Sequence, residues 1–250
     1  MTFLTLVRME VYRFWRLIGQ TVFPSLMTTV LFILIFGYSM GSRIQEVHGF
    51  SYINYLFPGL VAMGVITNAY ANTIASLFMA RLDKSIDNIL STPVKPVELV
   101  VALVLGAVLR GLLIGFLVLA IGFCLLGQTP SHWIGLLYFL LTSSISFGCL
   151  GIVSALMAKT FDNTATLQNF VLTPLVYLAG VFYSVSFLPP FWKTISQWNP
   201  LFYLVDGIRW GILGITDANI AFAASFCGIL AVVLLFFCVW LFRIGFRLVR

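Results

Sequence analysis

The sequence predicts an all-α membrane protein with six transmembrane helices, an N-terminal amphipathic interfacial helix, and re-entrant helices before the last span. Of its 250 residues, 61% are hydrophobic and only 9% are charged, whereas soluble domains carry about 45–50% and about 25%. A water-soluble fold of this size has no means of burying so much apolar surface. The apolar residues also form long runs, each close to the roughly 20 residues that cross a bilayer as one helix. Residues 1–250 therefore form one membrane domain.

The first predicted element is an amphipathic helix within residues 1–19. At about 100° per residue, its apolar side chains form one stripe: Phe3, Val7, Val11, Phe14 and Ile18, with Leu4 and Trp15 beside it. The basic side chains fall mostly on the other side, as expected for a helix lying in the membrane interface. Two roles stay open for this helix: it either anchors the chain at the membrane or binds a cytoplasmic partner through Arg13 and Arg16. Its charges also argue against a cleavable signal peptide.

Six apolar runs follow, at residues 20–41, 56–80, 99–126, 134–158, 164–185 and 220–242. They define a six-helix membrane domain over residues 20–242, with a tail over residues 243–250. Six spans place both termini on one side, and ten of the fourteen Lys and Arg residues fall there: Arg8, Arg13, Arg16, Arg81, Lys84, Lys95, Lys159, Arg243, Arg247 and Arg250. Arg43, Lys193 and Arg209 fall on the other side. Because basic residues collect in cytoplasmic loops, both termini are expected in the cytoplasm.

The connection over residues 81–98 mixes charged with apolar side chains. Its apolar residues are Leu82, Ile86, Ile89 and Leu90, and Pro93 and Pro96 follow them. This pattern predicts a short amphipathic helix with a turn behind it. Any cytoplasmic loop would carry charge, but a loop that met only water would have little use for these apolar residues. They are therefore expected to contact a partner.

The connection over residues 186–219 is not a simple loop. It begins with Pro189, Pro190, Trp192, Trp198 and Pro200, and continues in an apolar stretch over residues 201–215. Asp206 and Arg209 interrupt that stretch, which is too short and too polar for a comfortable span. The segment predicts a re-entrant helical hairpin in which Asp206 and Arg209 pair at i, i+3.

Arg110 is the one charged residue well inside a predicted span. A cation at that depth costs at least ~2.5–3.5 kcal/mol, so it should face protein or water. Asn68 and Asn72 in the second run are its expected uncharged partners, and small residues near Arg110 let another helix approach closely. Two interpretations stay open. Arg110 either joins helices by hydrogen bonds or draws anionic substrate groups along a pathway.

The sequence holds no motif for chemistry of its own. It lacks the GxxxxGK[ST] nucleotide loop as well as HExxH and GxSxG. His48 and His132 lie in separate predicted outer loops without Cys or carboxylate at ligand spacing, and the four cysteines form no metal or redox pattern. No metal, no cofactor and no enzymatic activity are expected on this chain. The net charge of +6 is attributed to topology and anionic lipid rather than to nucleic acid.

One region resembles a known family. Its residues are Leu172-Thr173-Pro174-Leu175, Leu178-Ala179-Gly180-Val181-Phe182-Tyr183, Leu188-Pro189-Pro190-Phe191-Trp192, Asn199-Pro200-Leu201 and Arg209. They resemble the signature region of ABC-2 type exporter permeases, and the whole chain fits that pattern. It is similar to the single-domain bacterial branch that includes drug-efflux, nodulation-factor and polysaccharide-export permeases.

The resemblance implies a homodimeric permease of the bacterial inner membrane, working with two copies of a separate ATPase that binds ATP and Mg. The interfacial helix and first cytoplasmic loop would dock on the ATPases. The re-entrant helices would close the pathway on the outer side, in an outer gate made of Pro189, Pro190, Trp192, Asn199, Pro200, Asp206 and Arg209.

The expected function is therefore the permease subunit of an ATP-binding-cassette exporter. Its substrate would be an amphipathic, lipid-linked, glycan or drug-like molecule that leaves the cytoplasm or inner leaflet. Two alternatives remain. A secondary transporter would typically carry acidic or His relays in its spans and show repeated halves, and neither is seen. A non-transporting membrane scaffold is the other.

The first prediction concerns topology. Reporter fusions after Arg250 should read cytoplasmic and fusions near Ser131 should read external, because basic residues cluster on one side of the six-span arrangement. An external C-terminus would refute the arrangement.

Overall fold

The structure, a computed structural model, describes residues 3–16, 18–39 and 46–247. Within these ranges every named element is a helix, and the one β-type pairing is an isolated bridge between Val47 and Phe50, which confirms the all-α class. The main helices are α1 (Phe3–Arg16), α2 (Ile18–Ser39), α3 (Tyr52–Leu82), α4 (Ser85–Leu90), α5 (Pro96–Leu126), α6 (Trp133–Met157), α7 (Phe161–Leu167), α8 (Thr173–Leu178), α9 (Pro190–Trp198), α10 (Pro200–Leu213) and α11 (Ile220–Arg243). Two short turns, η1 (Gln168–Leu172) and η2 (Val185–Phe187), complete the described elements.

Five of the described helices are long and apolar enough to cross a membrane: α2, α3, α5, α6 and α11. The expected fifth span, residues 164–185, differs from the prediction. It is divided into α7, a π-helical turn η1 and α8, and it ends at Leu178. In η1 the amide of Thr173 donates to the carbonyl of Gln168, five residues back, and Pro174 has no N–H to continue a regular ladder. The count of six spans stays a prediction.

Gly180 sets the point where the chain leaves this helix. Its φ of 79° lies in the left-handed region, which glycine adopts without steric cost. The chain turns there into the η2 segment, so the stretch after Leu178 that was expected to be helical runs as a loop across α3. The carbonyl of Phe182 in this loop accepts a hydrogen bond from Tyr52 Oη at 3.0 Å.

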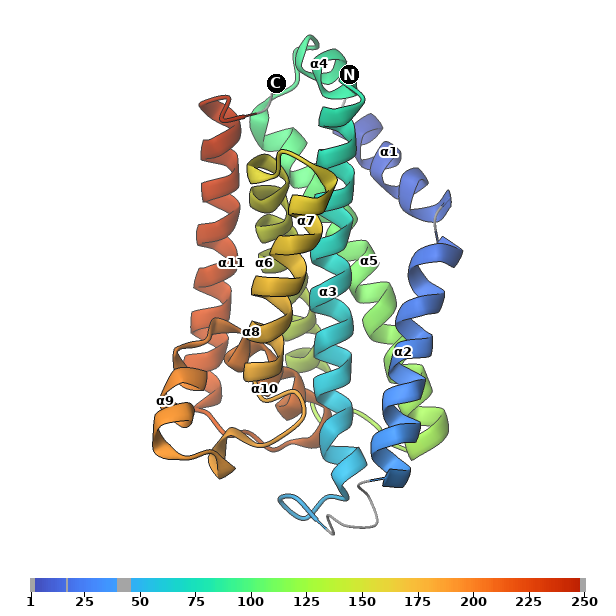
Figure 1. Ribbon diagram of the computed structural model, residues 1–250, viewed down its shortest axis with the longest axis vertical. Helices are drawn as coiled ribbons and strands as arrows, with labels where there is room; N and C mark the ends of the chain where they lie inside the picture. The colour runs from blue at the N-terminus through green and yellow to red at the C-terminus, as the bar shows by residue number, and fades with distance from the viewer. Residues whose placement is uncertain (1–2, 17, 40–45, 248–250) are drawn as a thin grey trace.

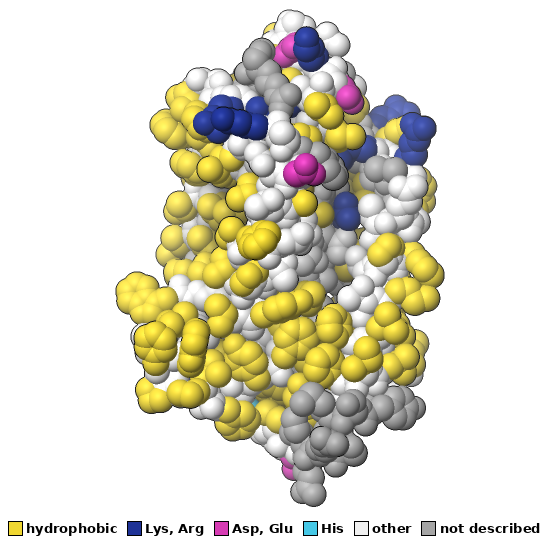
Figure 2. Space-filling view, in the orientation of Figure 1, with side chains coloured by type: hydrophobic (Ala, Val, Ile, Leu, Met, Phe, Trp, Pro, Cys, Tyr) yellow, Lys and Arg dark blue, Asp and Glu magenta, His cyan; other side chains and the backbone are white. Residues whose placement is uncertain are grey.

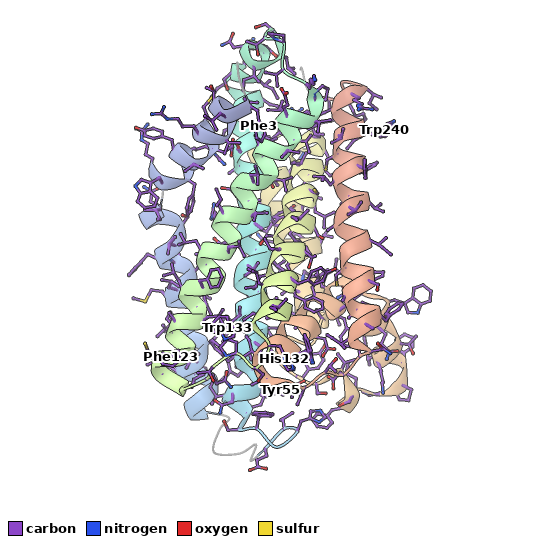
Figure 3. All side chains as sticks on the ribbon, turned by 180° about the vertical axis from the view of Figure 1, so that it is seen from behind. Phe3, Tyr55, Phe123, His132, Trp133 and Trp240 are labelled. Carbon is purple, nitrogen blue, oxygen red and sulfur yellow. The ribbon has the colours of Figure 1, made fainter. Side chains whose placement is uncertain are left out.

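The two ends of the bundle differ (Figure 1). One end carries α4, the start of α1 and the end of α11, and is called the α4 end; the opposite end carries α9 and α10, and is called the α10 end. Lys and Arg side chains gather near the α4 end, while hydrophobic side chains cover most of the rest of the visible face (Figure 2). From behind, Phe3 and Trp240 lie toward the α4 end and Tyr55 and His132 toward the α10 end (Figure 3).

The predicted cytoplasmic segments thus share one end of the molecule, in agreement with the expected arrangement of loops. Which end faces the cytoplasm stays a prediction. Arg43 and Arg250, both used in the count of basic residues, lie outside the described residues.

α3 is the central helix of the bundle. It contacts α2, α4, α5, α6 and α10, and its packing against α6 includes a glycine, Gly151, at a point with no room for a side chain. A Cβ on Gly151 would lie 2.6 Å from the carbonyl oxygen of Tyr70 and closer still to the Thr73 hydroxyl. One turn away, Thr73 Oγ1 donates to the carbonyl of Gly148 at 2.8 Å. Small residues let helix backbones approach in this way inside a membrane.

The second prediction tests this contact. Gly151→Ala should lower the thermal unfolding temperature of the purified protein in detergent, because the new methyl group forces α6 away from α3, at a cost of about 1–3 kcal/mol. Gly19→Ala is the matched control, since nothing lies within 4 Å of its added Cβ, and it should leave the temperature unchanged or slightly raised. Equal stability of the two variants would show that α3 and α6 can move apart and admit the methyl group at little cost in free energy of unfolding.

Candidate functional site

Three buried polar residues form a stripe along α3. Asn68, Asn72 and Ser76 follow one another at intervals of four residues, so their side chains share one face of the helix. All three are buried. This stripe, called the α3 polar ladder below, bonds to side chains from α1, α2 and α5.

Asn68 joins three helices through one amide group. Arg110 of α5 donates from Nε and Nη2 to Asn68 Oδ1, at 3.2 and 3.0 Å. Asn68 Nδ2 in turn donates to Ser25 Oγ of α2 at 2.9 Å. The structure therefore pairs Arg110 with the first of its two expected partners. These bonds hold the guanidinium against protein groups inside the bundle, as the cost of a cation in lipid requires.

Asn72, the second expected partner, bonds to Arg13 instead. Arg13 Nη2 donates to the Asn72 backbone carbonyl at 3.2 Å and to Oδ1 at 3.4 Å. The same nitrogen pairs with Glu10 Oε2 at 2.7 Å, and Glu10 Oε1 accepts a hydrogen bond from Ser76 Oγ at 2.5 Å. Two charged side chains of α1, Glu10 and Arg13, thus bond this helix to α3.

This arrangement changes the place assigned to Arg13. It was expected on a surface for a cytoplasmic partner, but its guanidinium turns toward the bundle, while Arg16 is exposed. Glu10 was missed as a site residue, although its i, i+3 spacing to Arg13 was visible in the sequence. Its side chain is only 13% exposed.

The apolar residues of the 81–98 connection divide into two groups. Ile86 is 3% exposed, and with Ile89 it lines a cavity of about 40 Å³ against Leu6 of α1 and Leu99 of α5. The expectation that Ile86 meets a partner protein is therefore wrong, because α4 folds back onto its own chain. Leu82 and Leu90 remain 50% and 41% exposed.

At the α10 end, Asp206 and Arg209 form the predicted i, i+3 pair. Arg209 Nη1 lies 3.7 Å from Asp206 Oδ1, and both side chains are fully buried. Arg209 Nη2 donates to the carbonyl of Gly180 at 2.6 Å, and its guanidinium carbon lies 4.3 Å from the ring centre of Tyr55. The pair thereby joins α10 to α3 and to the loop behind α8.

Asp206 also organises the loop that follows α10. Its carboxylate accepts hydrogen bonds from Thr216 Oγ1 at 2.5 Å, from the amide of Asp217 at 2.9 Å and from the amide of Ala218 at 3.0 Å. Charge-assisted hydrogen bonds of this kind are stronger than neutral ones. The buried carboxylate therefore fixes the path of residues 216–218.

The other residues expected in the outer gate fall into two groups. Asn199 caps α10, since its Oδ1 accepts from the amide of Leu201 at 3.1 Å, and its Nδ2 donates to the carbonyl of Leu175 at 2.7 Å. Pro200 occupies the first turn of α10, where its missing N–H costs nothing. The exposed group consists of Pro189, Pro190 and Trp192.

A cavity of about 180 Å³ lies between α2 and α3, beside the Arg110–Asn68 contact. Hydroxyl and amide side chains line part of it: Ser25, Thr28, Thr29, Thr67 and Asn68. Thr28 and Thr67 donate to carbonyls of their own helices, at 2.8 and 2.7 Å. Their oxygens keep free lone pairs, so the cavity can accept hydrogen bonds from a polar group at mid-bundle. Among the residues that the structure describes, no three His, Cys, Asp or Glu side chains form a group suited to a metal ion.

Comparison with known proteins agrees with this architecture. Residues 1–213 match the family model described as ABC-2 type transporter. The chain is similar to the inner membrane transport permease YadH of Escherichia coli K12, with 43% identity over 208 residues, 83% of this chain and 81% of that protein. It is also similar to nodulation protein J of Rhizobium leguminosarum bv. viciae, with 28% identity over 204 residues, covering 80% and 78% of the two chains.

The third prediction concerns the joint between Arg110 and Asn68. Arg110→Ala should lower thermal stability in detergent by about 1–2 kcal/mol, because the Asn68 oxygen loses both donors inside the bundle. Arg110→Gln keeps donors and should retain much of the stability, whereas Arg110→Lys loses the planar fork that fits the amide oxygen.

A double-mutant cycle gives the matched control. Arg110→Ala combined with Asn68→Ala should be strongly non-additive, while its combination with Thr73→Ala, on the face of α3 that bonds to α6, should be additive to within about 0.5 kcal/mol. An Arg110→Ala variant that is as stable as the parent but inactive in transport would instead assign Arg110 to the substrate.

Proposed function

Because the chain belongs to the ABC-2 type transporter family, we propose that it is the permease subunit of an ATP-driven exporter in a bacterial inner membrane. Two copies of the chain work with two copies of a separate ATPase, which binds ATP and Mg. The α4 end faces the cytoplasm and the α10 end faces outward. The match to an inner membrane transport permease supports the location and the class of activity.

The placement of α4 is the observation that carries this proposal. Ile86 anchors one face of the helix inside the chain, while Leu82 and Leu90 are about half exposed at the end where basic residues gather. Charged neighbours such as Asp83 and Lys84 surround them. Apolar side chains within a polar rim are typical of protein interfaces, so this surface fits an ATPase. With no nucleotide loop in this sequence, the energy comes from that partner.

α3 provides the connection from this surface to the opposite end. Its 31 residues span about 45 Å at 1.5 Å per residue. Leu82 ends it beside α4, and Tyr55 near its start lies beneath Arg209 of α10. ATP binding that closes the ATPases would displace α4, and α3 carries the displacement to the residues that close the outer side.

The substrate passes between α3 and α2 in this mechanism. The hydroxyl-lined cavity and the Arg110–Asn68 joint lie on that route. Their oxygens and the nearby cation support a substrate with a polar, hydrogen-bonding portion, within the wider group of amphipathic, lipid-linked, glycan and drug-like molecules. An apolar portion can remain in contact with lipid.

One transport experiment separates the exporter from its two rivals. Vesicles containing the chain, with and without a co-expressed ATPase, are supplied with fluorescent amphiphiles and short-chain fluorescent lipids. An exporter requires the ATPase and is inhibited by vanadate, a secondary transporter responds to an ion gradient alone, and a scaffold moves none of the probes.

The fourth prediction tests the docking surface. Replacing Leu82 and Leu90 together by Asp should abolish co-purification of the ATPase, because charges take the place of the apolar contact, while membrane insertion and thermal stability remain those of the parent. Asn88→Asp, an exposed change on the same helix, adds charge without removing an apolar side chain and should keep the ATPase bound. Retention of the ATPase by the double variant would count against α4 as the docking site.

A further inference from the structure

Three segments far apart in the sequence meet around His48 at the α10 end. His48 lies between α2 and α3, Ser184 and Phe187 follow α8, and Asp217 lies between α10 and α11. His48 Nε2 is 3.3 Å from Ser184 Oγ and 3.7 Å from Asp217 Oδ1. The imidazole stacks on the Phe187 ring, with centres 5.7 Å apart and planes 4° from parallel. Its side chain is 39% exposed, so protons reach it from solvent.

The Ser184 hydroxyl lies among three side chains. It donates to Asp217 Oδ2 at 2.8 Å and lies 2.6 Å from Ser186 Oγ. With its hydrogen directed at Asp217, Ser184 Oγ is an acceptor for a proton on His48 Nε2. A second proton, on Nδ1, makes the ring an imidazolium and turns its contact with Asp217 into an ion pair.

Of the charged groups described near His48, Asp217 is the one that lies within ion-pair distance of it. Asp206 is paired with Arg209 and accepts the backbone amide of Asp217. Tyr55 lies 6.0 Å from the His48 ring, measured between ring centres, and its ring also lies against the Arg209 guanidinium. On its own segment, Glu46 is exposed. Asp217 is the carboxylate that His48 touches.

We propose that His48 is a positioning residue for the outer closure, defined as residues 179–188, α9, α10 and residues 214–219, and that protonation of His48 tightens this closure. In the closed arrangement the imidazolium meets Asp217, and separating the segments removes that partner. A charged imidazole therefore favours the closed arrangement more than a neutral one does. Imidazole groups change charge between about pH 8 and pH 5.

The α10 end is taken as outward on the basis of the proposed function. The contact of His48 with Ser184 and Asp217 joins three segments of this chain. It can be tested without transport, an ATPase or a known substrate. The two proposals can therefore fail independently.

The fifth prediction follows hydrogen exchange of the purified protein in detergent by mass spectrometry at pH 5.5 and 8.0, with correction for intrinsic rates. Peptides covering residues 179–188 and 214–219 should be about two- to fivefold better protected at pH 5.5, the range expected for an ion pair near a surface. His48→Gln should remove this difference between the two pH values. Asp217→Asn should remove it as well, without a change at His48.

Two further variants make the result specific. His48→Lys keeps a permanent cation and should give, at pH 8.0, the protection that the parent shows only at pH 5.5. His132→Gln is the matched control: the His132 ring packs against Trp210 at 4.3 Å between ring centres, tilted by 44°, and takes part in no ion pair among the described residues, so this variant should retain the parent's pH dependence. A His48→Gln protein with the parent's pH dependence, or a parent without any, would overturn the proposal.

Discussion

Polar side chains inside a membrane bundle must find partners within the protein, and the α3 polar ladder is where this constraint shapes the molecule. In hydrocarbon no water replaces a missing hydrogen bond, so an unpaired amide or charge is costly. Asn68 is met by α5 and α2, Asn72 by α1, and Ser76 by α1 again. On another face, Thr73 reaches the backbone of α6. The positions of four helices around α3 follow the hydrogen bonds made by one short stretch of its sequence.

The ends of α3 are fixed by cations in a similar way. Arg81, near its last turn, donates to the carbonyls of Ala155, Leu156 and Ala158 at the end of α6. A helix C-terminus exposes unpaired carbonyls and attracts positive charge, so this contact satisfies both partners. At the other end, Arg209 of α10 lies against Tyr55. α3 is therefore held to α6 at the α4 end and to α10 at the α10 end.

The sequence was sufficient to predict the features that follow from composition, from the free-energy cost of a charge in lipid, or from the spacing of neighbouring residues on a helix. Composition alone predicts helices in lipid, the expense of a buried cation predicts a polar partner for Arg110, and i, i+3 spacing predicts the pairing of Asp206 with Arg209. The burial of Ile86 could not be predicted, because an amphipathic pattern shows which face is apolar but not whether its own chain covers that face. The hydropathy of the sequence likewise does not predict the π-helical turn that divides the expected fifth span.

The contacts of His48 and Arg13 could not be predicted for a different reason, since each depends on segments that only the tertiary fold brings together. Yet Arg13 carries a consequence for how α1 works. An interfacial helix held only by its apolar stripe could slide or lift independently of the bundle. Glu10 and Arg13 bond to α3 on the same face that holds Arg110, so α1 cannot shift far without breaking partly buried, charged hydrogen bonds. Ile86 of α4 and Leu6 of α1 line the same small cavity, and α4 also contacts α3. A displacement of α4 towards the bundle would therefore act on α3, and through the polar ladder α3 would either carry α1 with it or exchange hydrogen-bond partners.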